Sequence, residues 1–163
     1  MGEIKELHTR VTHYLDERNV PYKIKFHSRP VFTSEEAAVE RGVRLSQVIK
    51  TMLLTDGKEI LIVVLPSDRR LETKKIKKLT GHKNLQFMDK ESIEQKMGLT
   101  VGAVAPVGCG FDELRMFVDP SVFEEEFLDI SSGDPRAGLE LHRENLKDLL
   151  KQGKFVNVTK EER

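Results

Sequence analysis

VIKTMLLTDGKEILIVVL, residues 48–65, is the stretch that decides the fold. Two runs of leucine and β-branched residues flank Asp56-Gly57, a dipeptide typical of two-residue hairpin turns. We therefore predict two antiparallel strands, over residues 47–55 and 59–65. The second strand is apolar on both faces between Ile60 and Leu65, which indicates a position in the middle of a sheet.

The segments before this hairpin show helix and strand patterns of their own. One stripe of an amphipathic helix is formed by Ile4, Leu7, Val11 and Leu15. Apolar and basic residues alternate over 22–26, as they do in a half-buried strand. Thr33 and Glu36 have the spacing of a capping box, so we expect a second helix to begin there and to end at Gly42.

The rest of the chain continues this mixture of elements. We predict helices over residues 70–79, 90–97 and 146–150, and strands over 85–87, 115–118, 127–130, 138–141 and 155–158. The expected fold class is α+β: a single compact domain, residues 1–163, in which helices surround a mixed, largely antiparallel sheet.

Composition limits the classes of function. Hydrophobic residues make up 38% of the 163 and charged residues 33%, while 27 basic and 27 acidic residues cancel in formal charge. This balance argues against a protein that coats DNA by bulk attraction. The chain has one cysteine, a charged N-terminal segment, and no apolar run of the ~20 residues that span a bilayer. We expect a cytoplasmic protein with no membrane contact.

Common catalytic signatures are missing from the sequence. It contains no Gly-x-Ser-x-Gly elbow, P-loop, His-Glu-x-x-His helix or paired cysteine motif. The five histidines are scattered, so we predict neither a metal site nor a cofactor. Cys109 has two interpretations, as a nucleophile or as a thiol that packs as a small hydrophobic group.

Lys50 is a charged residue inside an apolar strand. Burial of an unpaired charge is costly, so a lysine in a central strand indicates a functional site. A lysine on an edge strand could instead extend its amine to solvent, and the spacing leaves both interpretations open.

Two loops could also bind a ligand. Residues 102–108, GAVAPVG, allow close approach of the backbone to a ligand, and free N–H groups there could face a developing negative charge. The same residues could form only a tight connection. Residues 131–134, SSGD, could bind a ligand or simply join two strands.

These three segments, in this order, resemble the YbaK/EbsC family, which includes the editing domain inserted in bacterial prolyl-tRNA synthetases. The similar stretches are Ser34–Ala38, Ser46–Thr51, Gly102–Gly108, Val118–Ser121, Ser131–Gly133 and Leu139–Leu141. The resemblance extends from about Pro21 to Leu150. It implies a hydrolase that removes the wrong amino acid from aminoacyl-tRNA, by itself or together with prolyl-tRNA synthetase or another synthetase.

The resemblance also implies the site. Its lysine corresponds to Lys50 and its Gly-x-x-x-Pro loop to the segment from Gly102 to Pro106, and these are the predicted catalytic groups. The predicted substrate-binding residues are His27, Phe32, Thr51, Ala103, Val104, Ala105, Ser131 and Gly133. Loop N–H groups would stabilise the oxyanion, Lys50 would hold the end of the substrate, and the substrate itself would supply the general base.

The substrate implied is a small amino acid on tRNA, such as alanine or cysteine on tRNA-Pro, or a seryl or threonyl ester. The tRNA body could contact a basic segment through Arg70, Lys74, Lys75 and Lys78, although these could equally form a solvated helix face. Two other functions remain open: a non-catalytic module that binds aminoacyl-tRNA or a synthetase, and an esterase built around Cys109.

Overall fold

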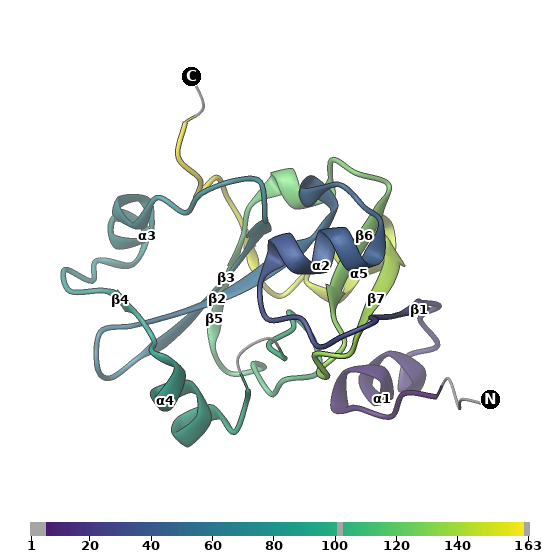
Figure 1. Ribbon diagram of the computed structural model, residues 1–163. Helices are drawn as coiled ribbons and strands as arrows, with labels where there is room; N and C mark the ends of the chain where they lie inside the picture. The colour runs from purple at the N-terminus through teal and green to yellow at the C-terminus, as the bar shows by residue number, and fades with distance from the viewer. Residues whose placement is uncertain (1–5, 101–102, 162–163) are drawn as a thin grey trace.

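The predicted hairpin forms the centre of the larger of two sheets (Figure 1). A computed structural model describes residues 6–100 and 103–161. In it, β2 (Ile49–Thr55) pairs antiparallel with β3 (Ile60–Pro66) around the Asp56-Gly57 turn. The strand order is β4-β2-β3-β5-β8, with β4 (Gln86–Phe87), β5 (Arg115–Val118) and β8 (Lys154–Phe155). β3 therefore lies in the middle of a sheet, as predicted.

A second, three-stranded sheet lies beside the start of β2. Its order is β1-β7-β6, with β1 (Lys23–Phe26), β7 (Ala137–His142) and β6 (Phe127–Ser131), all antiparallel. One bridge, between Val48 and Asp129, connects it to the larger sheet. The strands are thus divided between two sheets. β4 pairs with β2 only at Leu54 and Thr55, so it does not reach the start of β2, where the Val48–Asp129 bridge brings β6 close.

The helices lie around these sheets (Figure 1). They are α1 (Arg10–Glu17), α2 (Ser34–Arg41), α3 (Thr73–Thr80), α4 (Lys90–Ser92) and α5 (Arg143–Leu149), with short turns η1 (Leu45–Gln47), η2 (Ile93–Met97) and η3 (Pro120–Phe123). The Thr33 side chain caps α2 by accepting the Glu36 N–H, and Gly42 ends the helix. Instead of the single helix predicted over 90–97, the chain forms one short α-turn that continues as a wider π-turn.

The core is packed on both faces of β3. Ile62 and Val64 face the larger cluster, shared with α1, α5 and the three-stranded sheet, whereas Leu61 and Val63 face the cluster under α3. All four are fully buried, which explains why this strand reads as apolar at every position. A search of the described residues found no helix of the length and apolar character that crossing a membrane demands.

Candidate functional site

A small cavity opens where the two sheets meet. Its volume is about 230 Å³, and its walls come from α2, the start of β2, the end of β6 and the loop after residue 102. Five residues predicted from the sequence line it: Phe32, Lys50, Thr51, Val104 and Ser131. The order of strands brings them together, because the Val48–Asp129 bridge holds the start of β2 beside β6.

Lys50 extends into this cavity from β2. The backbone at Lys50 is paired with Leu65 of β3 on one side, whereas β4 covers the other side of β2 only at Leu54 and Thr55. β2 is an inner strand of the sheet, but Lys50 lies in its part that β4 leaves uncovered. Burial lowers the pKa of Lys50, and the charge of Arg70 acts in the same direction, whereas Glu35 and Asp68 oppose it. Among the described residues, Lys50 Nζ has no hydrogen-bond or ion-pair partner, so it is available to a ligand.

Thr51 adds a second polar group to the same wall. Its hydroxyl oxygen is buried and has no hydrogen-bond partner among the described residues. A buried polar atom without a partner costs free energy.

His27 does not line the cavity, in contrast to its predicted place as a pocket residue. Its Nδ1 lies 2.9 Å from the Pro135 carbonyl oxygen, and its Nε2 accepts a hydrogen bond of 3.1 Å from Arg41 Nε. Burial is the main cause that lowers the pKa of His27. His27 therefore acts as a neutral acceptor that holds Arg41.

Arg41 is the charged cavity residue that the sequence analysis missed. It lies at the end of α2, four positions after Ala37, and both side chains line the cavity. This spacing places Arg41 on the same helix face as the buried Ala37, and it could have been recognised in the sequence. A cation on the buried face of a helix is costly unless it has a hydrogen-bond or ion-pair partner. Only the fold shows that the partner is His27.

Asp129 lies behind Arg41 on β6. Its side chain is completely buried, and neither carboxylate oxygen has a hydrogen-bond partner among the described residues. Lys25 Nζ is 3.5 Å from Oδ1 and forms a closer ion pair with Glu140. Burial raises the pKa of Asp129 to about 6, although the charges of Lys25 and Arg41 act against this shift.

This raised pKa predicts a pH-dependent difference in stability between the wild type and Asp129→Asn. A carboxyl whose folded-state pKa lies above its ordinary value of 3.8 contributes stability below pH 4 and loses it as the pH rises through 6. Asparagine does not titrate. Relative to the wild type, the variant should therefore gain roughly 2–3 kcal/mol of unfolding free energy between pH 4 and pH 7.5. Urea unfolding of both proteins across this range measures it, and parallel stability curves would contradict it.

The loop of residues 102–108, which was predicted to stabilise the oxyanion, borders two cavities. Val104 lines the cavity with Lys50, whereas Pro106 belongs to a second cavity of about 670 Å³ between the loop and α1. Pro106 therefore does not line the cavity beside Lys50, and its predicted catalytic role stays a prediction. Gly102, the other predicted catalytic residue of the loop, lies outside the described residues.

The loop N–H groups differ in their availability. The Ala103 N–H donates to the Thr100 carbonyl oxygen at 2.8 Å, so it is not free for a substrate. Ala105 is fully buried and does not line the cavity. Within the described part of the chain the Val104 N–H has no acceptor, which leaves it as the loop donor that a substrate oxygen could use.

Gly133 packs against α1 rather than against the cavity. A Cβ built on it would lie 3.3 Å from both Thr9 Cβ and Val11 Cγ2. Gly133 does not line the cavity, so its observed place is structural and its predicted contact with substrate stays a prediction. Ser131, two residues earlier, does line the cavity.

Cys109 packs into the main core. It is 4% exposed, and burial raises the pKa of its thiol. It also lies on the side of the loop away from Lys50. This environment disfavours the thiolate that a nucleophilic cysteine requires. Within residues 6–100 and 103–161, no group of three His, Cys, Asp or Glu residues is placed to hold a metal ion.

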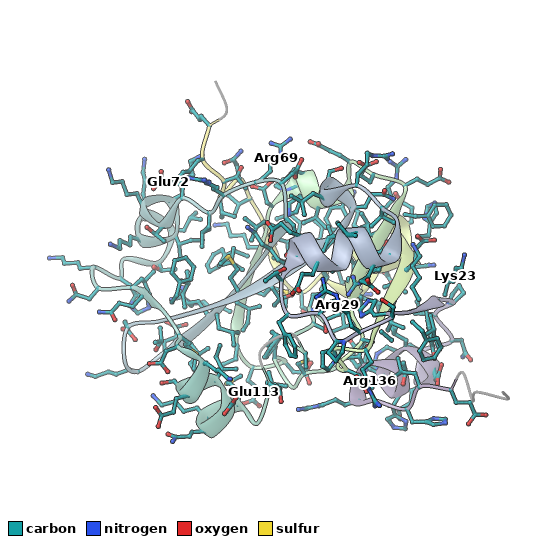
Figure 2. The ribbon with its side chains drawn as sticks, in the orientation of Figure 1. Lys23, Arg29, Arg69, Glu72, Glu113 and Arg136 are labelled. Carbon is teal, nitrogen blue, oxygen red and sulfur yellow. The ribbon has the colours of Figure 1, made fainter. Side chains whose placement is uncertain are left out.

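The basic segment around α3 is only partly available to a partner. Lys75 Nζ bonds Asn157 Oδ1 at 2.7 Å and the Thr159 carbonyl oxygen at 2.6 Å, so it holds the C-terminal segment. Arg70, Lys74 and Lys78 are exposed. Figure 2 shows charged side chains spread over the outside of the molecule, among them Arg69 and Glu72 close to the start of α3.

The fold and this cavity define an aminoacyl-tRNA editing enzyme, the class that the sequence predicted. The family model described as aminoacyl-tRNA editing domain matches residues 28–149. The chain therefore belongs to the aminoacyl-tRNA editing domain family, and the α+β fold class is confirmed.

Similar proteins have related descriptions. The prolyl-tRNA editing protein ProX of Acetoanaerobium sticklandii is 26% identical over 142 residues, 84% of this chain and 86% of ProX. EbsC of Enterococcus faecalis, a candidate Cys-tRNA(Pro)/Cys-tRNA(Cys) deacylase, is 23% identical over 157 residues, 94% of each chain. A crystal structure described as a candidate trans-editing enzyme for prolyl tRNA synthetase has the same fold, with a TM-score of 0.79 at 22% identity over 93% of this chain and 96% of that one.

Proposed function

We propose that this protein is a trans-editing deacylase that hydrolyses the ester between a small amino acid and the terminal ribose of tRNA, with a proline tRNA as the carrier. The observation that carries the proposal is Lys50, which projects without a partner into a cavity of about 230 Å³. The descriptions of ProX and EbsC support the tRNA. With this substrate we propose a cytoplasmic location and a synthetase as the source of the mischarged tRNA.

The cavity supplies hydrogen-bond donors to an ester. Lys50 would hold the substrate end beside the carbonyl, and the Val104 N–H would face the carbonyl oxygen as negative charge develops there. Water would attack the carbonyl carbon, the ester bond would break, and the ribose oxygen would leave with a proton. No Asp or Glu of the described residues lines the cavity, which is why we assign the general base to the substrate's own ribose hydroxyl.

A small cavity suits this task. A synthetase gains only about 1–3 kcal/mol of discrimination from one methylene, so it cannot fully reject amino acids smaller than its own. A second, smaller site can accept those errors and exclude the correct amino acid. We infer that the walls formed by Val31, Ala37 and Val48 set this size limit.

A deacylation panel tests the proposed function. Proline tRNA carrying alanyl, cysteinyl, seryl, threonyl or prolyl esters is incubated with wild type and Cys109→Ala. Release of at least one small amino acid, with prolyl-tRNA left intact and the Cys109 variant fully active, would support the proposal. Binding of charged tRNA without any hydrolysis would support a non-catalytic module instead, and loss of activity in Cys109→Ala would support thiol chemistry.

The basic segment makes a separate prediction about the tRNA body. Neutralising Lys74 and Lys78 together should raise KM for charged tRNA about 3–10-fold at low salt and leave kcat unchanged, because phosphate contacts act mainly on binding. The matched comparison is Lys75→Ala, which should instead lower the melting temperature, since Lys75 holds Asn157 and Thr159. An unchanged KM at low salt in the double variant would rule this surface out as the tRNA contact.

A further inference from the structure

The Arg41 guanidinium forms one end of the cavity with most of its hydrogen-bonding capacity unused. Of its five N–H donors, the one on Nε bonds His27 at 3.1 Å. Within the described residues, the four on its terminal nitrogens have no acceptor. Burial is the first cause that lowers the pKa of Arg41, so these donors are partly withdrawn from water. A hydrogen bond from such a donor to a ligand oxygen makes the free energy of binding more favourable.

The position of the guanidinium is fixed by two neighbours. His27 accepts from Nε and is itself held by Pro135. Gly138 of β7 lies directly against the group, since a Cβ built there would be 2.1 Å from Arg41 Nε. The guanidinium therefore packs directly against the Gly138 backbone. This contact and the His27 hydrogen bond fix the orientation of its terminal nitrogens. A donor fixed before binding loses little entropy when a ligand arrives.

The charges around Arg41 decide what kind of oxygen fits. The positive charges of Arg41 and Lys25 are matched by the two carboxylates of Asp129 and Glu140. Lys25 forms ion pairs with both carboxylates, and the charge of Arg41 acts on Asp129. Lys50, the other cation of the cavity, is assigned to the reacting end of the ester. A third carboxylate, on the substrate side chain, would therefore meet Asp129 and Glu140 near Arg41 with no further cation beside it. A neutral acceptor such as a hydroxyl oxygen meets no such opposition.

We propose that Arg41 is a specificity-determining residue, which selects aminoacyl esters whose side chain carries a hydroxyl oxygen over those with a plain aliphatic side chain. This inference rests on the proposed function and names its substrate class. An alanyl group would leave the terminal nitrogens of Arg41 unpaired in the cavity, and a site built to bond a hydroxyl discriminates against the analogue that lacks it. His27 is then a positioning residue that acts through Arg41.

The test compares esters on one tRNA. Seryl, threonyl, alanyl and aspartyl esters of the same tRNA are prepared by chemical acylation, and kcat/KM is measured for wild type, Arg41→Leu and Arg41→Lys. Wild type should prefer the seryl or threonyl ester over the alanyl ester by about 10–100-fold. Arg41→Leu should bring this ratio close to one with little change for alanyl, and Arg41→Lys should lie between them because lysine lacks the planar fork. Since each ratio is measured on one enzyme sample, incomplete folding of a variant cancels.

His27→Ala supplies the positioning control. It should lower the seryl-to-alanyl ratio less than Arg41→Leu, and it should have no further effect in an Arg41→Leu background. A wild-type preference for the alanyl or aspartyl ester, or an equal loss on all esters in Arg41→Leu, would overturn the proposal. If no ester is hydrolysed, the proposed function fails separately, and the affinity of wild type and Arg41→Leu for the non-hydrolysable 3′-seryl- and 3′-alanyl-aminoadenosines still decides the role of Arg41.

Discussion

Replacement of Lys50 by alanine is expected to lower kcat/KM for deacylation by about 10²-fold, because the ester that Lys50 holds would lose its alignment for attack. The free energy of unfolding should stay the same or rise. Lys50 Nζ has no protein partner in the described residues, and its burial opposes the charged form. Alanine thus removes a desolvated charge without breaking an ion pair. Single-turnover deacylation and urea unfolding of the same samples measure both effects.

Lys58 offers a matched control for this prediction. It is an exposed lysine at the turn of the same hairpin, outside the cavity. Lys58→Ala should leave activity and stability within experimental error of the wild type. Lys50→Arg keeps the charge but not the compact ammonium, so it should recover only part of the activity. Wild-type activity in Lys50→Ala would remove the central group from the proposed mechanism, whereas a large loss of stability would mean that Lys50 is structural.

Elements with strong local chemistry could be predicted from the sequence. The Asp56-Gly57 dipeptide located the turn between β2 and β3, and the observed strands agree with the predicted ones to within two residues. The register pairs Thr55 with Ile60, so the connection spans residues 56–59 and not the dipeptide alone. Thr33 and Gly42 likewise marked both ends of α2. In each case the turn or helix end is predicted from the residues that form it, and contacts with the rest of the molecule are not needed for the prediction.

The roles of several site residues depend on neighbours that are distant in sequence. Arg41 is recognised as a cavity residue only when His27 and Gly138 are seen beside it. Lys75 looked like its neighbours in the basic segment until the contacts to Asn157 and Thr159 were known. A pattern in one segment cannot show a contact made across more than 80 positions. For the same reason the sequence could not reveal which side of the 103–110 loop faces Lys50.

Helix α1 packs against both loops that bear cavity residues. Thr9 Oγ1, at its N-cap, donates to the Ser132 carbonyl oxygen at 2.5 Å. Gly108 lies so close to the helix that a Cβ there would be 2.8 Å from Val11 Cα and 2.9 Å from the Arg10 carbonyl oxygen. The residues matched by the family model begin at 28, after this helix. α1 therefore adds a support that holds the Val104 and Ser131 loops in place.

Gly108→Ala should accordingly be the most destabilising of the single substitutions considered, by roughly 2–5 kcal/mol. The backbone at Gly108 has a φ of +74°, which costs about 1–2 kcal/mol for a residue with a Cβ. The new methyl group would also meet backbone atoms of α1, which cannot move aside as a flexible side chain can, and overpacking of this kind adds about 1–3 kcal/mol. Urea unfolding at pH 7.5 gives the difference in free energy.

Gly81→Ala separates the two causes of this loss. Gly81 ends α3 with a φ of +79°, and nothing lies within 4 Å of a Cβ built on it, so its substitution carries the backbone strain alone. The excess loss in Gly108→Ala therefore measures how tightly α1 presses on the loop. That excess should be accompanied by a lower kcat at temperatures where the variant stays folded, because Val104 lies on the displaced loop. Equal losses in the two variants would mean that the helix does not constrain the loop, and the Val104 N–H would then have to be positioned by the substrate itself.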